Sequence, residues 1–218
     1  MTPDDFLKEL DDQVKNALGR IGAASASGDP KPDMSVAALL TLALKNELEA
    51  AEEAAIWLTS EKDVDVKLAL ARQCGDEAKH YRLIEERLKE LGVDTTRINP
   101  LAQGYSPMFD YLRTLKTTAE RIAAGQFTRE ALARVRNQVF IDWCESGGDH
   151  DTAALYRDTI QPDEGFHHEL GRRLLPRFVA TAEDQARARS AAMRVLELAE
   201  ELQEVARLRG GLCRLPGC

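Results

Sequence analysis

The chain is 218 residues long, 44% hydrophobic and 30% charged, with a formal net charge of −8, which suits one domain with appendages. The acidic balance argues against a nucleic-acid-binding surface driven by net charge. The longest apolar run, Val36 to Leu44, is far shorter than the roughly 20 residues that span a bilayer, and the opening stretch "MTPDDFLKEL" lacks a signal-peptide pattern. We therefore expect a cytoplasmic protein with no membrane partner.

Hydrophobic residues recur at helical spacing along most of the chain, and period-two alternation is absent over any useful length. The predicted fold is therefore all-α. In chain order we expect a short helix over residues 4–18, a linker over 22–33, helices over 35–59 and 63–91, a loop over 92–107, helices over 109–124 and 128–146, a turn at "GGDHD", and helices over 151–179 and 182–208.

Capping and helix-breaking residues define several of these boundaries. Ser35 is placed to begin the first long helix and Asp63 to cap the second. Gly125 is expected to break a helix, with Thr128 capping the next one. Pro162 lies inside a helical pattern, and its missing N–H predicts a kink or a local bulge there.

Two parts of the chain resemble each other. "WLTSEKDVDVKLALARQCGDEAKHYRLIEERL" begins at Trp57, and "WCESGGDHDTAALYRDTIQPDEGFHHELGRRLL" begins at Trp143. Each has a tryptophan, a short turn and then a helix that carries Asp-Glu-x-x-His, and the match needs one gap. A duplicated helical hairpin predicts a four-helix bundle over residues 35–179. A helix and linker over 1–34 and a helix with a cysteine-containing tail over 180–218 would flank it.

Acidic and imidazole side chains interrupt the apolar faces of three predicted helices. Residues at i and i+3 share a helix face. Glu77 with His80, and Glu164 with His167, can therefore each direct an oxygen and a nitrogen to a common point. Glu47 is the core-facing acid of the first long helix. Three carboxylates and two imidazoles are thus expected to point into one apolar interior.

Such an interior needs compensating charge, because an unpaired buried ion costs several kcal/mol. The three apolar stripes carry no Lys or Arg that could supply it, and Glu49, Glu52 and Glu53 are expected to lie off the stripe of the first long helix. A pair of divalent cations would satisfy the buried groups. Mixed carboxylate and imidazole donors suit iron or manganese, whereas thiolates would have suggested zinc. The four cysteines are expected to be free thiols.

The pattern formed by Glu47, by "DEAKH" over 76–80 and by "DEGFH" over 163–167 resembles the ferritin-like diiron carboxylate superfamily. The stretch "GDHDTAALYRDTIQPDEGFHH" in particular resembles the last ligand helix of rubrerythrin-like proteins. The resemblance covers about residues 35 to 179. Its motifs are typical of the superfamily and not of any one activity within it.

The resemblance implies that Glu77 and Glu164 bridge or cap two metal ions, and that one histidine of each hairpin ligates each ion. Asp76 and Asp163 match positions outside the ligands, where each would accept a hydrogen bond from the histidine of the other hairpin. That bond would orient the imidazole. The ligands carried over in this way are Glu47, Glu77, His80, Glu164 and His167.

A fourth acid is expected some 25–30 residues before Glu164, by symmetry with the first hairpin. The local match of "KNEL" with "RNQV" puts Gln138 opposite Glu47. Glu130 is the nearest acid but lies about two turns upstream. Three readings stay open: Gln138 is a neutral ligand, Glu130 reaches the site through a shift in register, or the site is degraded. An amide in place of a carboxylate would weaken the affinity for a hard cation.

The resemblance implies an oxidoreductase that activates O₂ or peroxide with two iron ions, or with manganese, on a small-molecule substrate. The chain lacks the two Cys-x-x-Cys pairs of a rubredoxin module, so an oxygenase would need an external electron donor. Two alternatives stay open: an iron-binding or ferroxidase protein, and a non-catalytic bundle with a vestigial metal site. The terminal helices are expected to cover the bundle or to build a homodimer.

Overall fold

The computed structural model describes residues 1–27, 35–209 and 216–217, and this part of the chain is all-α, without a strand. The π-helical segments are η2 and η3, whereas η1 and η4 are 3-10 turns. The elements are α1 (Pro3–Ser27), α2 (Val36–Ser60), α3 (Val64–Glu90), η1 (Thr95–Arg97), α4 (Pro107–Leu112), α5 (Thr118–Ile122), η2 (Ala123–Arg129), α6 (Glu130–Ser146), α7 (His150–Leu155), η3 (Tyr156–Ile160), α8 (Gln161–Leu174), η4 (Leu175–Phe178) and α9 (Ala182–Arg209).

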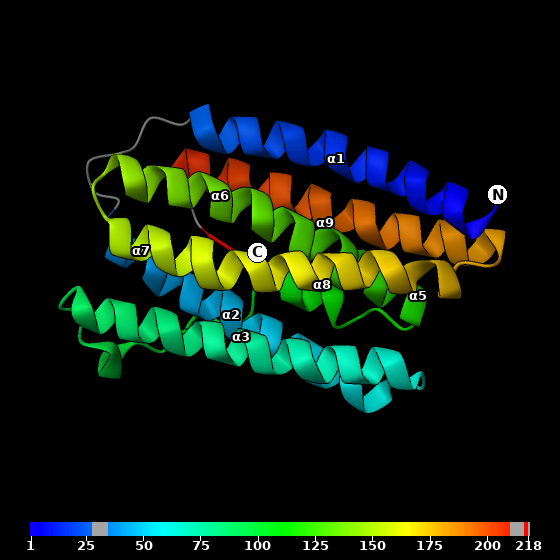
Figure 1. Ribbon diagram of the computed structural model, residues 1–218, viewed down its shortest axis with the longest axis horizontal. Helices are drawn as coiled ribbons and strands as arrows, with labels where there is room; N and C mark the ends of the chain where they lie inside the picture. The colour runs from blue at the N-terminus through cyan, green and yellow to red at the C-terminus, as the bar shows by residue number, and fades with distance from the viewer. Residues whose placement is uncertain (28–34, 210–215, 218) are drawn as a thin grey trace.

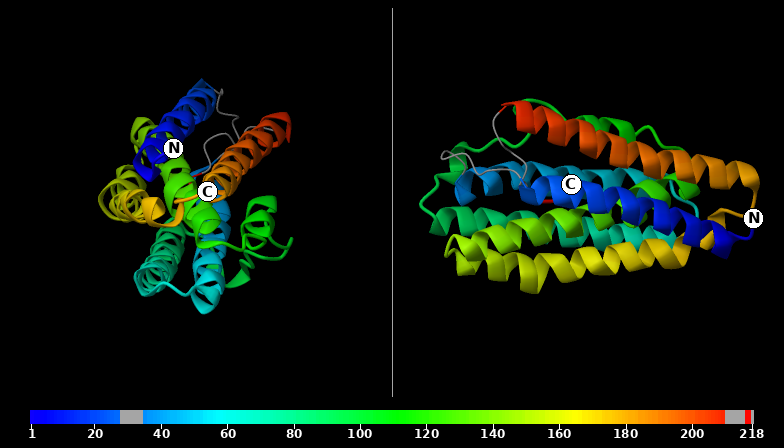
Figure 2. Two further views of the ribbon diagram at one scale, coloured as in Figure 1. Left: turned by 90° about the vertical axis from the view of Figure 1, so that its right-hand side faces the viewer. Right: turned by 90° about the horizontal axis from the view of Figure 1, so that it is seen from above.

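The centre of the molecule is formed by two helical hairpins of two rods each, and Figure 1 shows the rods side by side. The first hairpin is α2 and α3, joined at residues 61–63. The second hairpin has α5, η2 and α6 as one rod and α7, η3 and α8 as the other, joined at residues 147–149. The helices α1 and α9 pack on the second hairpin, on the side away from α2 and α3 (Figures 1 and 2).

The predicted starts of both helices of the first hairpin are confirmed, and both Ser35 and Asp63 are N-cap residues. The Ser35 side chain accepts a hydrogen bond from the Ala38 N–H at 3.1 Å. The Asp63 carboxylate accepts bonds from the N–H groups of Asp65 and Val66, at 3.0 and 3.1 Å. Each cap satisfies N–H groups that have no partner within the helix. Each long helix of this hairpin therefore begins at a residue whose side chain favours that boundary.

Other predicted boundaries are wrong. The first helix extends beyond residue 18 to Ser27, so the helix takes up the start of the predicted linker, whose residues 28–33 lie outside the described residues. The helix predicted over 109–124 is interrupted, because a capping box formed by Thr117 and Glu120 begins α5 after α4 has ended.

Gly125 does not break the chain direction, because the third rod continues through it as the π-helical η2. A Cβ at Gly125 would lie 2.7 Å from Cζ3 of Trp57, so the glycine lets the tryptophan ring of α2 pack on the backbone. Thr128, predicted to cap a helix, is fully buried inside η2 instead. Glycine here marks a close approach between two rods and not a helix end.

The bulge predicted at Pro162 is confirmed. The π-helical η3 ends two residues before Pro162, and the Gln161 N–H bonds the carbonyl of Tyr156, five residues earlier. Proline cannot donate to the carbonyl four residues before it, and its ring crowds that carbonyl. A π-turn widens the helix at this point and lets it continue into α8.

Two apolar clusters fill the bundle along its length. One includes Trp57, Leu70, Phe127 and Leu174, together with buried residues of α1 and α9. The other lies toward the opposite end of the rods and includes Leu44, Ile84, Phe140 and Tyr156. On α2, α3 and α8 the candidate polar residues lie between the positions that contribute to the two clusters. Within the described residues, none of the helices combines the length and apolarity needed to cross a membrane.

Gly171 of α8 sets how closely the fourth rod approaches η2. A Cβ there would lie 2.7 Å from the nitrogen of Phe127 and 2.8 Å from the carbonyl carbon of Gln126. We expect Gly171→Ala to lower the free energy of unfolding in urea by about 1–3 kcal/mol, because neither backbone atom can yield easily.

Gly75 provides the matched control, because it lies inside α3 with nothing within 4 Å of its built Cβ. Gly75→Ala is expected to raise the free energy of unfolding by up to about 1 kcal/mol, since alanine is the better helix former. A neutral or stabilising Gly171→Ala would show that α8 does not need this close approach.

Candidate metal centre

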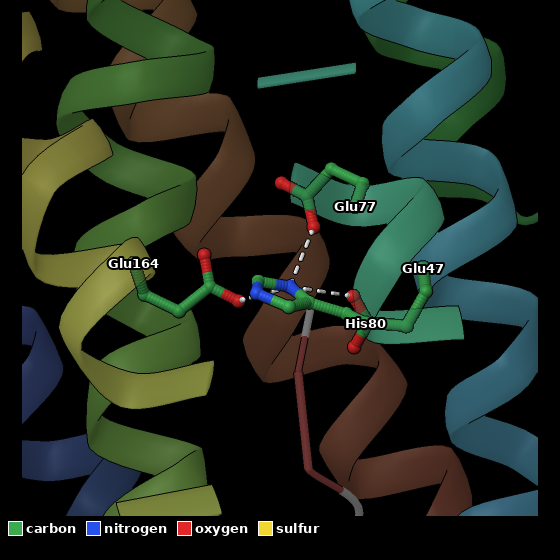
Figure 3. A group of neighbouring side chains, drawn as sticks. All are labelled: Glu47, Glu77, His80 and Glu164. Atoms are coloured by element: carbon green, nitrogen blue, oxygen red, sulfur yellow. Dashed lines mark hydrogen bonds and ion pairs between the residues drawn. The ribbon is translucent and has the colours of Figure 1, made fainter. Parts of the chain in front are cut away.

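Six buried polar residues converge between the apolar clusters, and together they come from all four rods. Glu47 comes from α2, Glu77 and His80 from α3, Glu130 from the first turn of α6, and Glu164 and His167 from α8. Each of the six is no more than 3% exposed. Figure 3 shows four of them, with the imidazole of His80 between the carboxylates of Glu47, Glu77 and Glu164.

Three carboxylates surround the inner nitrogen of His80. Its Nδ1 lies 3.5 Å from Oε2 of Glu47, 3.3 Å from Oε2 of Glu77 and 3.8 Å from Oε1 of Glu164. One donor atom from each of these four residues lies within 4.8 Å of all the others. The group could therefore hold a metal ion.

A second group of the same composition surrounds His167. Its Nδ1 lies 3.7 Å from Oε1 of Glu77, 3.8 Å from Oε2 of Glu130 and 3.4 Å from Oε2 of Glu164. Glu77 and Glu164 belong to both groups, and each presents one oxygen to His80 and the other to His167. The two groups are thus joined by two carboxylates that can face two centres at once.

The outer nitrogens of the two histidines bond across the hairpins. Nε2 of His80 lies 3.2 Å from Oδ2 of Asp163, and Nε2 of His167 lies 3.1 Å from Oδ2 of Asp76. These are the contacts that the family resemblance implied. Because a carboxylate accepts, the Nε2–H of each ring donates, which leaves Nδ1 as the nitrogen that faces the glutamates. Oδ2 of Asp163 also forms an ion pair with Nζ of Lys79 at 2.8 Å.

Burial together strongly shifts the pKa values of Glu47, Glu164 and His80. Burial raises the pKa of Glu47 to about 7 against the opposing effect of His80, and raises the pKa of Glu164 well above its ordinary value. Burial would lower the pKa of His80, but hydrogen bonds and attraction from Glu47 and Glu77 outweigh it and raise the pKa to about 12. Without a cation, bound protons must therefore offset much of the glutamate charge.

Two atoms of the site lack a partner with hydrogen-bond geometry: Oε2 of Glu164 and Nδ1 of His167, which both face the second group. Unsatisfied buried polar atoms are costly in a folded protein. The charges of two divalent cations would balance four glutamates. The donor set, its charge and its two unsatisfied atoms all fit metal ions, and metal binding would displace the protons from the histidines.

The structure shows which of Gln138 and Glu130 occupies the place expected for the fourth acid of the site. Gln138 is exposed on α6, and its amide donates to Asp142 at 2.8 Å, so Gln138 does not lie at the site. Glu130 is 2% exposed and belongs to the second group. Glu130 precedes Glu164 by 34 residues, whereas Glu47 precedes Glu77 by 30. The π-turn η3 takes up part of the difference, because a π-turn holds an additional residue.

Two glutamines that the sequence analysis did not single out orient Glu130. Nε2 of Gln73 donates to Oε1 of Glu130 at 2.6 Å, and Oε1 of Gln73 accepts from Nε2 of Gln126 at 2.8 Å. Gln73 is 4% exposed, whereas its neighbour Cys74 is half-buried. The spacing of four between Gln73 and Glu77 was the signal that could have identified this residue.

The prediction that Glu49 and Glu53 lie off the buried face of α2 is wrong, because each is 4% exposed. Oε2 of Glu53 forms a buried ion pair with Nη1 of Arg129 at 2.8 Å. Glu49 accepts hydrogen bonds from the backbone N–H and the hydroxyl of Ser106, which tie the loop before α4 to α2. The face of α2 that points inward is wider than one stripe, because several elements pack on it.

His168 contacts the π-helical segment and not the metal centre. Its Nδ1 lies 2.7 Å from the carbonyl oxygen of Phe127, and the ring packs on that of Phe127 at 5.3 Å between centroids. His168 therefore has a packing role against η2. Cys74 and Cys144 are free thiols, as predicted, whereas Cys213 and Cys218 lie outside the described residues.

The fold and the site define an all-helical bundle with two joined groups of buried Glu and His side chains, each of which could hold a metal ion. No family model, curated protein or solved structure matches the chain.

Proposed function

We propose that the chain binds two metal ions in its core and works as an oxidoreductase that activates O₂ or peroxide, with iron as the metal and manganese as the alternative. The division of the Glu77 and Glu164 oxygens between His80 and His167 carries the proposal. Two carboxylates shared in this way are the arrangement that two adjacent cations need. The donor set contains oxygen and imidazole nitrogen but no thiolate, which favours iron or manganese.

Iron bound here would supply the electrons that reduce O₂ or peroxide. The chain itself would hold, orient and shield that metal. Asp76 and Asp163 fix the direction of the two imidazoles, and Gln73 fixes Glu130. The apolar clusters at either side of the site exclude water from the rest of the core.

The space beside the glutamates limits what can reach them. A cavity lined in part by Glu47, Glu77, Glu130 and Glu164 offers about 10 Å³ to the centre of a water-sized sphere. That volume is close to the minimum that holds one water molecule. In this conformation the cavity has room for at most about one water molecule, so O₂, peroxide and any larger substrate require an opening of the structure.

The placement of Glu130 weighs against the alternative of a vestigial site. That alternative depended on Gln138 in place of the fourth acid, whereas the structure has four glutamates around the two histidines. The ferroxidase alternative uses the same metal site and differs in what consumes the oxidising equivalents. We favour the oxidoreductase because α1 and α9 cover the second hairpin, where a compact iron-storage subunit would have no such helices.

Anaerobic loading with Fe(II), followed by removal of loosely held metal, tests the proposal. We expect about two irons per chain for the unmodified protein and for Gln138→Ala, because Gln138 lies outside the site. Glu130→Ala is expected to leave about one iron, because Glu130 belongs to the second group alone. Loss of iron from Gln138→Ala, or two irons retained by Glu130→Ala, would contradict this assignment of the ligands.

A further inference from the structure

A two-residue segment near the C-terminal end lies over the metal centre. Pro216 and Gly217 are buried, although most of the tail around them is outside the described residues. The segment lies beside the middle of the bundle and far along the chain from the helices that it touches (Figure 1). Its described contacts are with residues of α2 and α6.

Two asparagine side chains hold the backbone of this segment. Nδ2 of Asn46 donates to the carbonyl oxygen of Pro216 at 3.1 Å, and the N–H of Gly217 donates to Oδ1 of Asn137 at 2.8 Å. One amide thus binds the C=O of a peptide and the other binds the N–H of the next residue. Asn137 is fully buried, and its Nδ2 has no hydrogen-bond partner, so the pair retains an unused donor that faces the interior.

The backbone of Gly217 packs directly against the site. Its φ angle is +75°, a region that side-chain-bearing residues adopt at a cost. A Cβ there would lie 3.4 Å from Nδ2 of Asn46 and 3.7 Å from Oε1 of Glu47. These are ordinary van der Waals distances, so glycine is favoured here by the positive φ, and the segment lies next to a candidate metal ligand.

Gly217 is also part of the wall of the cavity at the glutamates. The cavity of about 10 Å³ is bounded by Gly217 together with Asn46, Ala50, Ala133 and Arg129 around the carboxylates. With the segment in place, this route leaves room for about one water molecule. Displacement of the segment would remove the wall that Gly217 provides.

We propose that Asn46 and Asn137 form a peptide-binding pair that holds residues 216–217 as a plug over the metal centre. Release of the plug admits molecules larger than water to the glutamates and histidines. The role of the plug in catalysis rests on the proposed function, whereas the binding of the segment and the closure of the cavity do not. The pair recognises backbone groups alone, so a peptide-like substrate or partner segment is the class of ligand that could displace the plug.

The metal-free protein tests the plug without any assumption about metal. The chain has four histidines and 14 glycines, so selective isotope labelling of each type gives tractable NMR spectra. We expect the Gly217 amide hydrogen to be protected from exchange. We also expect a bulky soluble nitroxide to leave the ring signals of His80 and His167 sharp.

Two kinds of variant should release the plug. Asn137→Ala removes the acceptor of the Gly217 N–H. Gly217→Pro removes the donor and cannot adopt a positive φ, and it leaves every helix unchanged. In Asn137→Ala we expect fast exchange of the Gly217 amide hydrogen. In both variants we expect at least about tenfold stronger nitroxide broadening of the His80 and His167 ring signals. Tenfold corresponds to 1.4 kcal/mol, which is within the range for one lost buried hydrogen bond.

Gln138→Ala is the matched control, because it removes an exposed amide next to Asn137 on the same helix. It should behave as the unmodified protein. An unprotected Gly217 amide, or histidine signals that broaden equally with and without the plug variants, would overturn the proposal. Gly217→Pro keeps the test valid even where Asn137→Ala fails to fold.

The same variants in the Co(II)-loaded protein test the link to metal. Removal of Co(II) by a chelator is expected to be about tenfold faster or more in Asn137→Ala and Gly217→Pro, because neither change touches a candidate ligand. Absence of Co(II) binding in all proteins would contradict the proposed function but leave the NMR result to decide on the plug. Bound Co(II) that leaves at one rate in all proteins would show that the segment does not gate the site.

Discussion

Replacement of Glu164 by leucine is expected to abolish binding of both metal ions. Glu164 contributes one oxygen to the group around His80 and the other to the group around His167. Loss of a shared ligand should therefore lower the affinity for each ion by more than the roughly 10–100-fold seen when a residue behind a ligand is changed. Iron per chain after anaerobic loading is expected to fall from about two to near zero.

Two further variants allow the loss of metal binding by Glu164→Leu to be compared with no loss and with a moderate loss. Glu169→Leu removes an exposed acid from the same helix and should leave the iron content unchanged. Asp76→Asn weakens the support of His167 only and should lower affinity within the 10–100-fold range. We expect metal-free Glu164→Leu to be at least as stable as the unmodified protein in urea, because burial opposes the charge of Glu164. Two irons bound by Glu164→Leu would contradict the shared position of this carboxylate.

Arg129→Met is expected to lower the free energy of unfolding by about 3–5 kcal/mol, because it leaves Glu53 buried without its cation. The two side chains are 6% and 4% exposed, and they meet at 2.8 Å. The double variant with Glu53→Leu should recover most of the loss, since an apolar pair of similar volume fills the space without charge. Urea denaturation of the metal-free proteins measures both effects.

The loss should depend on pH in a defined direction. Burial raises the pKa of Glu53 to about 7, with Arg129 opposing the rise, so removal of Arg129 should raise it further. A carboxyl whose folded pKa lies above its unfolded pKa binds more protons in the folded state, and its contribution to stability is lost as pH rises. The deficit of Arg129→Met should therefore be smaller at pH 5 than at pH 8. A deficit that shrinks at higher pH would mean that Glu53 is not the group left unpaired.

Arg177→Met serves as the surface comparison. Arg177 pairs with Asp63 and Asp65, but its side chain is 43% exposed. Exposed ion pairs contribute about 1 kcal/mol or less, because water screens them. A loss for Arg129→Met no larger than that for Arg177→Met would show that the pair with Glu53 makes no special contribution to stability.

The hairpins and the core acids could be predicted from the sequence because they depend on local pattern. Apolar spacing identified α2 and α3 to within a residue or so at most ends, and the repeated Asp-Glu-x-x-His placed Glu77, His80, Glu164 and His167 inside the bundle. Helix geometry alone fixes which residues share a face. No knowledge of neighbouring helices was needed for these assignments.

Glu130 could not be assigned in this way, because its position depends on an insertion that spacing does not reveal. A π-turn shifts the register of a helix while its apolar pattern continues. Gly125 was misassigned for a similar reason. The sequence predicts a helix break there, but the glycine is needed because the ring of Trp57 packs against it. The burial of Glu53 likewise depends on Arg129, a residue 76 positions away.

Because the polar residues lie between two apolar clusters, the stability of the folded chain should depend on the metal concentration. A ligand that binds only the folded state raises its stability in proportion to the logarithm of the free ligand concentration. Ions held by α2, α3, α6 and α8 together would cross-link all four rods at mid-length. Where metal is scarce, the empty chain would open and be degraded more often, so that the amount of this protein would follow the supply of the metal that it binds.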